Sequence, residues 1–587
     1  MWKLRLKKFV YMLCFAFLCL IDQRIKTGSG LDGVIESFRD LTYIVVAILV
    51  LSHYRLQDFK KYWFLYVEWV IFSIIGGCLF AWKGEAVVMF PNDRVVLAVN
   101  LLLWGIVLIQ TVAGIFLEKR RPDFIRNPFA CVWLLMMAGM CILRKDIYWP
   151  EAYLMAFGIF YLTDYSEEER QLLFQGMLNG IILGFFLMQG WCFVFRPYDI
   201  VRYSGVYSNG NHNVVFYLIV LAAVCTKLLY AYRCRGSGVK PSEADAADVG
   251  SCIGRQIGNA CRIFLQVVVR IGYWFLAGAV LDLIVLTIGR TGYLVAVVLV
   301  FLAALLRYRV AARRWFLILP SLVKSAVMIM LCFCLMFPVV FEAVRYLPPV
   351  FHHPVWFWGE WNEDRVQSWQ PWDSENYIEF EDLMKMIDYR VGQIIEIPEI
   401  SRVTEGALLA NGDASAVAKE LPPKPSYVTE LQWERYQEML AEGYAIDIQE
   451  LQAAGNKYSI LVRYHIYRYY IHHLNWTGNP ADEQGFQMLP THWIGHAHNI
   501  YLQWGTDFGI PVMVLFIILI LWTIGHLIRR FHVTRDPQYA GYLLFFLVPC
   551  LFGMLEFCWG AGSLPIALMF FTWGRVMCVD KPGNINI

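Results

Sequence analysis

The sequence predicts an all-α polytopic integral membrane protein with about 14 transmembrane helices and one large, mainly helical extracytoplasmic loop. Three observations support this fold class. Hydrophobic residues make up 58% of the 587 residues and charged residues only 17%. The mean hydropathy of +0.48 lies above the range of soluble proteins. Finally, the apolar residues form separated runs, and short basic clusters lie between many of these runs.

Each apolar run is compared with the roughly 20 residues that a helix needs to cross about 30 Å of hydrocarbon, and the second and sixth runs are short by this measure. The first run follows the basic stretch 1–8 and lacks a small-residue cleavage site, so it is predicted to be a retained span rather than a removed signal peptide. The predicted spans centre on residues 9–21, 41–54, 63–82, 95–117, 128–143, 151–163, 171–195, 213–232, 263–288, 291–307, 315–341, 509–528, 540–558 and 562–578.

The basic loops predict the orientation of the chain. If the N-terminus is cytoplasmic, alternation of the spans also makes the C-terminus cytoplasmic, and the basic loops fall on the cytoplasmic side, as the positive-inside rule requires. These loops are residues 55–61, 118–126, 233–262, 307–314 and 529–535. Residues 196–212, the junction at Arg290 and the loop 342–508 are then extracytoplasmic.

Three regions follow from this topology. Residues 1–341 carry about 11 transmembrane helices, interrupted by a cytoplasmic linker at 233–262 whose Gly-, Ser-, Ala- and Asp-rich part is predicted to be flexible. Residues 342–508 form the extracytoplasmic loop, with an amphipathic helix expected around 427–452. Residues 509–587 carry about three further helices. The tryptophans between residues 356 and 372 favour an interfacial aromatic belt over a sugar-stacking platform.

Several function classes are excluded or disfavoured. A net charge of +2, with the basic residues spread over short clusters, gives no reason to expect a nucleic-acid partner. The chain has no phosphate-binding loop and no dinucleotide fingerprint, so neither ATP-driven chemistry nor a cofactor is predicted. All 15 cysteines lie in predicted spans or in the linker, so the large loop is expected to contain neither disulfides nor a cysteine metal site.

The strongest candidate for chemistry is the segment 495–503, Gly-His-Ala-His-Asn-Ile-Tyr-Leu-Gln, which ends the polar region just before an apolar run. His498 is predicted to be a general base, because imidazole accepts a proton near neutral pH. His496 would lie on the same side of an extended segment, and Asn499 would bond a backbone group or a sugar hydroxyl.

Two other interpretations of these histidines remain open. His496 and His498 could ligate zinc with His492 or His465 as a third ligand, although no cysteine or compact carboxylate set completes such a site, and no metal is predicted. Alternatively, the histidines could be structural and hydrogen-bonded at the mouth of the helix bundle.

Arginines near the extracytoplasmic face are the second group of candidates. Arg290 lies between two apolar spans, where a cation is costly without an anionic partner or an aqueous cavity. Arg202 lies in an extracytoplasmic loop, and Arg463, with Arg468 five residues later, opens an aromatic segment upstream of the histidines. Together these arginines would suit bidentate contacts with a phosphate or pyrophosphate. Snorkelling to the interface and simple solvation are the structural alternatives.

The order of these motifs resembles the O-antigen ligase/polymerase superfamily of bacterial envelope glycosyltransferases. The resemblance covers roughly residues 201 to 524 and rests on four stretches. They are Arg202-Tyr203-Ser204-Gly205 with Asn209-Gly210-Asn211, Gly289-Arg290-Thr291-Gly292, Arg463 to Gly478, and His498-Asn499 followed by Gly509 and an apolar span. The chain departs from the family pattern at Val512, where a small or polar residue is common, and at Gly289, where serine is common.

The resemblance implies a metal-independent glycosyltransferase in the bacterial cytoplasmic (inner) membrane. Its donor would be an undecaprenyl-pyrophosphate-linked glycan presented at the outer face, and its acceptor a growing glycan in a polymerase or a lipid in a ligase. A flippase and a chain-length regulator are candidate partners. His498 matches the family's essential histidine, and Arg202, Arg290 and, more weakly, Arg463 match its pyrophosphate-binding arginines. A supporting role is expected for Asn499, His496, Asn209, Asn211 and Arg468.

Three function classes therefore remain open, namely a glycosyltransferase, a secondary transporter and a non-catalytic component of envelope assembly. Within the glycosyltransferases there are two alternatives. The first choice is a polymerase of O-antigen, capsular or extracellular polysaccharide, followed by a ligase that attaches such a glycan to a lipid, teichoic-type or protein acceptor. A secondary transporter would need paired repeats of spans and a charged site near the midplane, and no such repeat is evident. A non-catalytic component of envelope assembly would tolerate replacement of His498.

Overall fold

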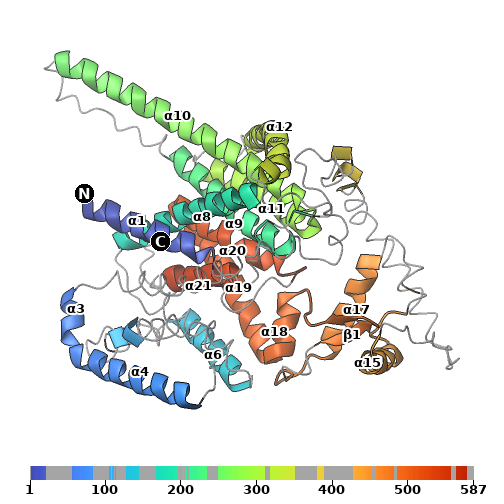
Figure 1. The fold of residues 1–587 in the computed structure, drawn as a ribbon. Helices are drawn as coiled ribbons and strands as arrows, with labels where there is room; N and C mark the ends of the chain where they lie inside the picture. The colour runs from blue at the N-terminus through green and yellow to red at the C-terminus, as the bar shows by residue number, and fades with distance from the viewer. Residues whose placement is uncertain are drawn as a thin grey trace.

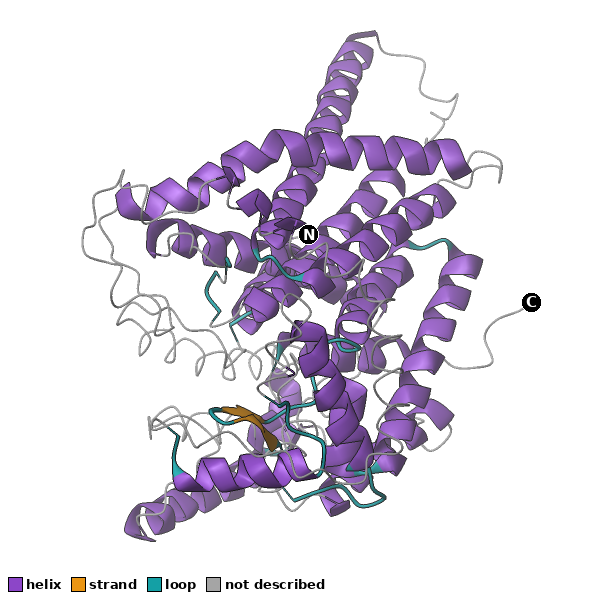
Figure 2. Cartoon of the chain, turned by 90° about the vertical axis from the view of Figure 1, so that its right-hand side faces the viewer, coloured by secondary structure: helices purple, strands orange, loops and turns teal. Residues whose placement is uncertain are grey.

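The computed structural model describes residues 2–20, 56–83, 127–143, 167–195, 202–203, 205–207, 210–233, 249–310, 318–350, 428–447, 450, 458–480, 485–556 and 563–577, with short pieces between 105 and 113 and between 380 and 388. This part of the chain is mostly helical, and its regular β-structure is a two-stranded hairpin (Figure 2). Six described helices are long and apolar enough to cross a membrane. The apolar helices indicate a membrane protein, as the sequence predicts.

The central helix of the bundle is α9 (Gly210–Arg233), which packs against α8 (Glu167–Phe195), α10 (Val249–Leu286), α11 (Arg290–Val310) and α20 (Pro537–Phe552) (Figure 1). Its residues from Asn213 to Leu229 are buried throughout. A helix that is apolar on every side can be buried on every side, which is why α9 lies at the centre.

Other helices surround this core. The helix α12 (Ile318–Val350) packs on α10, and α19 (Ile510–Thr534) packs on α20 and on α6 (Pro128–Leu143). The last helix, α21 (Leu564–Thr572), continues into the π-helix η9 (Trp573–Met577). Two more helices, α3 (Leu56–Lys61) and α4 (Trp63–Lys83), lie at one side of the molecule in Figure 1.

Small residues let α1 (Trp2–Leu18) approach α8 closely. Gly176, Gly180 and Gly184 follow one another at intervals of four on α8 and face α1. A Cβ at Gly176 would lie 2.6 Å from the Cβ of Tyr11, so a larger residue there would push the helices apart. Glycine at this spacing is a common device for close packing between helices in membranes.

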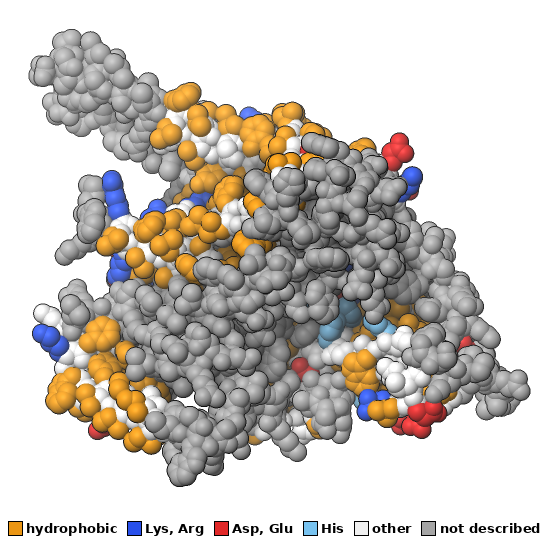
Figure 3. All heavy atoms as spheres, in the orientation of Figure 1, with side chains coloured by type: hydrophobic (Ala, Val, Ile, Leu, Met, Phe, Trp, Pro, Cys, Tyr) orange, Lys and Arg blue, Asp and Glu red, His pale blue; other side chains and the backbone are white. Residues whose placement is uncertain are grey.

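The outer surfaces of several helices carry exposed apolar side chains. Figure 3 shows such side chains gathered over α4 and α10. Phe72 of α4, Phe264 of α10, Leu319 of α12 and Leu521 of α19 are all more than 60% exposed. Exposed apolar side chains on long helices are expected where the solvent is lipid.

A smaller unit lies beside the end of the bundle, and it contains most of the described part of the predicted large loop (Figure 1). It comprises α15 (Glu430–Ala441), α17 (Tyr458–His472), the antiparallel strands β1 (Phe486–Leu489) and β2 (His492–Ile494), and α18 (Ile500–Phe508). The strands pair Phe486 with Ile494 and Gln487 with Trp493. The Thr429–Gln432 capping box starts α15.

The structure differs from the sequence prediction in several element boundaries. The described residues do not establish the count of 14 spans, since those predicted at 41–54 and 151–163 lie outside them and 95–117 mostly so. The tryptophans between 356 and 372 also lie outside. The helix expected around 427–452 is shorter, because the chain turns at Gly443 with φ of +77° after α15 ends.

Two predicted boundaries fall inside helices. The helix α10 begins at Val249, within the segment predicted to be a flexible linker. With 38 residues, it is much longer than a single span requires. The helix α12 continues past residue 341 to Val350, so the large loop begins later than expected. For these two helices, composition and membrane thickness predict the apolar part and miss the helical extension.

Candidate functional site

The candidate residues gather at one end of the helix bundle. The short connection 287–289 joins α10 to α11, and 535–536 joins α19 to α20, so each pair turns back on itself. The beginning of α11 lies against the beginning of α9, since a Cβ at Gly292 would be 2.3 Å from Val214, and the beginning of α20 lies near the end of α9, since a Cβ at Gly541 would be 2.5 Å from Thr226. The beginnings of α9, α11 and α19 and the ends of α10 and α20 therefore lie at the same end. One direct contact confirms this for α9 and α10, because Arg202 Nε donates to Thr287 O at 2.7 Å.

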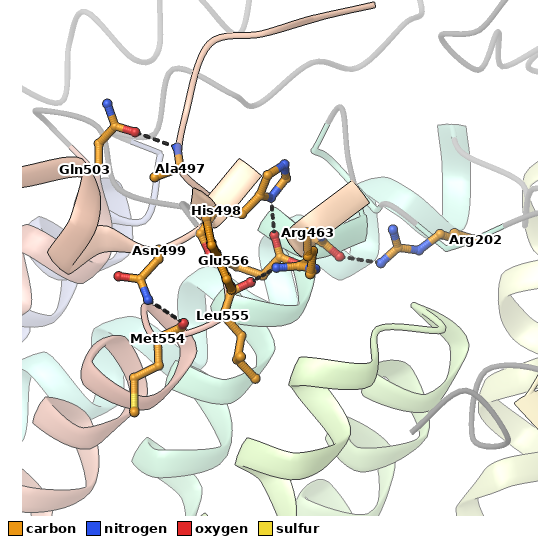
Figure 4. Close-up of polar contacts among 11 residues, drawn as sticks. Arg202, Arg463, Ala497, His498, Asn499, Gln503, Met554, Leu555 and Glu556 are labelled. Atoms are coloured by element: carbon orange, nitrogen blue, oxygen red, sulfur yellow. Dashed lines mark hydrogen bonds and ion pairs between the residues drawn. The ribbon is translucent and has the colours of Figure 1, made fainter. Parts of the chain in front are cut away.

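Hydrogen bonds fix the loop between β2 and α18 that carries the two histidines. The Ala497 N–H donates to Gln503 Oε1 at 2.7 Å. The Asn499 side chain caps α18 by accepting from Tyr501 N and Leu502 N, at 2.9 and 3.0 Å. The Asn499 Nδ2 atom also donates to Met554 O at 2.8 Å, which ties this loop to the turn after α20 (Figure 4).

The imidazole of His498 is paired with a carboxylate. Its Nδ1 atom lies 3.0 Å from Glu556 Oε2 (Figure 4). A carboxylate at this distance favours the tautomer in which Nδ1 carries the proton, which leaves Nε2 as the basic atom. Within the described residues, Nε2 makes no hydrogen bond. His498 also has φ of +47°, a backbone conformation that is uncommon for residues other than glycine and that recurs at functional sites.

Arg463 of α17 holds the other oxygen of the same carboxylate. Its Nη2 atom donates to Glu556 Oε1, and its Nη1 atom donates to Leu555 O. Glu556 is only 6% exposed. Burial by itself would raise the pKa of Glu556, but the hydrogen bond from His498 and the charge of Arg463 hold this pKa below its ordinary value. Glu556 is therefore ionised at neutral pH, between a cation and the imidazole.

His496 packs edge-on against His498, with ring centroids 4.2 Å apart. Burial and the neighbouring His498 lower the pKa of His496 from 6.5 to about 4. His496 is therefore neutral at pH 7, and it adds no second positive charge beside the catalytic candidate. The spacing of two residues does bring the rings together, as the sequence predicts.

The two other predicted arginines lie where the bundle helices begin. Arg202 Nη2 donates to Asn211 Oδ1 at 2.6 Å, so the asparagine motif at the start of α9 holds this guanidinium. Figure 4 draws Arg202 in the same close-up as His498 and Glu556. Arg290 is half-buried at the first position of α11, directly after the turn that Arg202 contacts. The remaining supporting candidate of this motif, Asn209, lies outside the described residues.

Arg468 does not join this group. Five residues correspond to about 140° around a helix beyond one full turn, so Arg463 and Arg468 point in different directions from α17. Arg468 Nη1 donates to Gly443 O at 3.1 Å and supports the turn after α15. Arg468 therefore stabilises the smaller unit, and the structure does not place it at the site where the sequence predicts a supporting role.

The two histidines considered as a third zinc ligand, His465 and His492, lie in different environments. His465 is buried on α17, with Nδ1 3.0 Å from Tyr444 O, and His492 is exposed on β2. In the described ranges, no group of three His, Cys, Asp or Glu side chains is arranged to hold a metal ion.

Glu556 is the residue that the sequence analysis missed. It is the one charged residue in the run 540–558, whose apolar composition predicts a membrane span. The helix α20 ends at Phe552, and the turn 553–555 brings Glu556 back toward His498. A lone carboxylate in an apolar run is a recognised signal for a functional residue, and this signal could have identified it.

Comparison with known proteins adds no relative: no protein-family model matches the chain, and neither a curated protein nor a solved structure matches it. The described residues define a helical membrane protein with an Arg–Glu–His network at one end of its bundle. Any assignment of function therefore rests on the chemistry of this network and on the motif resemblance.

Proposed function

We propose that this chain is a membrane glycosyltransferase that polymerises undecaprenyl-pyrophosphate-linked oligosaccharides on the outer face of the bacterial cytoplasmic membrane. The observation that carries the proposal is the pairing of His498 Nδ1 with Glu556, 3.0 Å apart, which leaves Nε2 available as a base. A base oriented by a carboxylate is the arrangement that activates a hydroxyl group for nucleophilic attack.

In the proposed reaction, Nε2 of His498 takes the proton of an acceptor sugar hydroxyl. The hydroxyl oxygen forms a bond to the anomeric carbon of the donor glycan, and the bond from that carbon to the pyrophosphate oxygen breaks. The electron pair leaves with undecaprenyl pyrophosphate. Because a pyrophosphate is already a weak base, the protein mainly has to neutralise its charge and align the acceptor.

In our proposal the three arginines have two different roles, donor binding and positioning of Glu556. Arg202 and Arg290, at the beginnings of the bundle helices, bind the donor pyrophosphate. Arg463 directs both of its terminal nitrogens at Glu556 and Leu555, so we assign it to hold the carboxylate rather than the donor. Arg463 also compensates the charge of Glu556, so that the carboxylate can remain ionised while buried.

The distribution of basic residues supports an extracytoplasmic site. Arg307 and Arg309 lie in the last turn of α11, and Arg529 and Arg530 lie near the end of α19. These ends are opposite to the end that carries His498, because α11 and α19 both begin at the His498 end. Positive residues mark the cytoplasmic ends of membrane helices, so His498 is assigned to the outer face.

The proposal is tested by expressing variants in the native host deleted for this chain. With His498→Ala, single lipid-linked repeat units should accumulate and long polymer should be lost on gels. The matched control is His472→Ala, an exposed histidine of α17 that contacts Tyr444 rather than Glu556, and it should support normal polymer. Immunoblots of membranes verify equal amounts of each variant.

Two results would contradict the polymerase assignment. Full-length polymer that is not attached to its acceptor would assign the chain as a ligase. An unchanged glycan profile with His498→Ala would remove the glycosyltransferase assignment and favour the transporter or assembly classes.

A further inference from the structure

A second basic cluster lies at the opposite end of the bundle from His498. It contains Arg270 of α10 and Arg307 of α11, whose guanidinium carbons lie 5.2 and 4.8 Å from the ring centroid of Tyr232, near the end of α9. The Arg307 guanidinium carbon also lies 5.7 Å from the ring of Trp274. The Trp274 Nε1 atom donates to the Tyr232 hydroxyl at 3.3 Å, which fixes the two rings relative to each other.

The cluster contains no compensating negative charge. Neither arginine forms an ion pair with any residue that the structure describes. Arg307 Nη2 donates to Ser325 Oγ and Ser321 O of α12, which are neutral acceptors. The Nε atom of Arg270 is buried and makes no hydrogen bond within the described chain.

The position of Arg270 makes this lack of a partner costly. Arg270 lies inside the segment Phe264–Leu286, which is apolar enough to span the membrane. An arginine at such a depth is stabilised by an anion or by water. Here the guanidinium is directed at Tyr232, between helices, while the neighbouring Val268 and Ile271 are exposed.

We propose that Arg270, Arg307 and Tyr232 form a binding site for the headgroup of an anionic phospholipid. The two guanidinium groups would bind the phosphate diester, with Ser325 beside them as a further polar contact. The exposed apolar side chains Val268 and Ile271 of α10 and Leu319 and Val323 of α12 would contact the acyl chains. Basic clusters between helices at the cytoplasmic side suit such headgroups. This inference depends on membrane insertion and not on the proposed glycosyl transfer.

The test measures lipid binding to the purified, delipidated full chain by native mass spectrometry. Phosphatidylglycerol is titrated against phosphatidylcholine as the neutral reference. Because each basic contact near a membrane surface contributes about a fivefold change in affinity, Arg270→Gln should weaken phosphatidylglycerol binding about fivefold and Arg270→Gln/Arg307→Gln about 25-fold. Phosphatidylcholine binding should stay unchanged.

The matched control is Arg309→Gln/Arg529→Gln. These arginines are exposed at the same end of the bundle, and the double variant removes the same charge. It should bind phosphatidylglycerol as the wild type does. Size-exclusion chromatography verifies that each variant is folded, and Arg270→Gln is informative on its own because it removes no hydrogen bond to a described residue.

Three outcomes would overturn the proposal. They are wild-type phosphatidylglycerol binding by Arg270→Gln, equal loss of binding by the control double variant, and displacement of the lipid by millimolar inorganic phosphate. The last result would assign the site to a soluble phosphate compound.

Discussion

The central residue of the proposed site is His498, and its chemistry depends on Glu556. Glu556 lies between Arg463 and the imidazole, so one buried carboxylate fixes the tautomer of the base and is itself neutralised by a cation. The resemblance pointed to His498, but it gave no indication of this partner. The contact joins residues 58 positions apart in the sequence, and such a contact follows from tertiary packing rather than from local pattern.

Glu556→Gln should reduce transfer about 100-fold or more, because a neutral amide no longer favours the Nδ1-protonated imidazole. Glu556→Asp keeps the charge and should retain more activity than the amide. The measurement is the initial rate of lipid-linked glycan elongation in membranes. Glu450→Gln is the control, since this half-exposed carboxylate lies near His465 instead. Equal rates for Glu556→Gln and wild type would exclude a positioning role.

His496 predicts a specific dependence of stability on pH. The unfolded chain binds a proton on this residue near pH 6.5, whereas the folded protein binds it only near pH 4. Between these values the unfolded state holds more protons, so the free energy of unfolding is largest above pH 6.5 and falls as the pH falls towards 4. The full difference is about 3 kcal/mol at most.

The comparison of wild type with His496→Gln isolates this contribution. Apparent melting temperatures in detergent, measured from pH 8 to pH 4, should fall more steeply for the wild type than for the variant, because the variant has no imidazole to protonate. Parallel curves for the two proteins would show that His496 titrates normally in the folded state.

At the scale of elements, α17 contributes to the site through one arginine and to the smaller unit through another. Helical periodicity explains this division, because Arg463 reaches Glu556 while Arg468 reaches Gly443. The sequence placed both arginines near the histidines, which holds for Arg463 alone. Most of the predicted apolar runs correspond to helices where the structure describes them, but α20 ends at Phe552, inside the run 540–558, and α10 and α12 extend beyond the predicted limits. Hydropathy detects the buried or lipid-facing part of a helix and not its polar continuation.

Arg463→Gln should therefore destabilise the protein by about 3 kcal/mol, because it leaves a buried carboxylate without its cation. Arg468→Gln loses one hydrogen bond to a backbone carbonyl and should cost about 1 kcal/mol. Thermal unfolding in detergent measures both effects. Transfer should fail only in the first variant. Similar stability losses in the two variants, with similar activities, would contradict the assignment of Arg463 to the network.

At the scale of the whole molecule, one end of the bundle carries His498, and the opposite end carries the arginines near the ends of α11 and α19. The alternation of positive loops and polar motifs along the chain predicts that the two kinds of residue lie on opposite sides of the membrane. The structure adds that the beginnings of α9, α11 and α19 lie together, which the order of motifs alone does not specify. In the described part of the chain, six helices between these two ends are long and apolar enough to cross a membrane.

The proposed orientation predicts which end is accessible from outside the cell. Thr491→Cys, next to β2, should react with a membrane-impermeant maleimide in intact cells. Arg309→Cys, at the end of α11, should react only after the cells are opened. Labelling of the otherwise unchanged chain gives the background from its own cysteines. The reverse pattern would place His498 in the cytoplasm and contradict the proposed access to the donor.

The central claim is that His498 activates a sugar hydroxyl toward a lipid-pyrophosphate-linked donor. The most direct measurement uses purified protein in liposomes that contain only the lipid-linked repeat unit, which serves as both donor and acceptor for a polymerase. Wild type should form lipid-linked dimers and release undecaprenyl pyrophosphate in equal amounts, and His498→Ala should form neither while remaining folded. Dimer formation by the variant at the wild-type rate would contradict the claim.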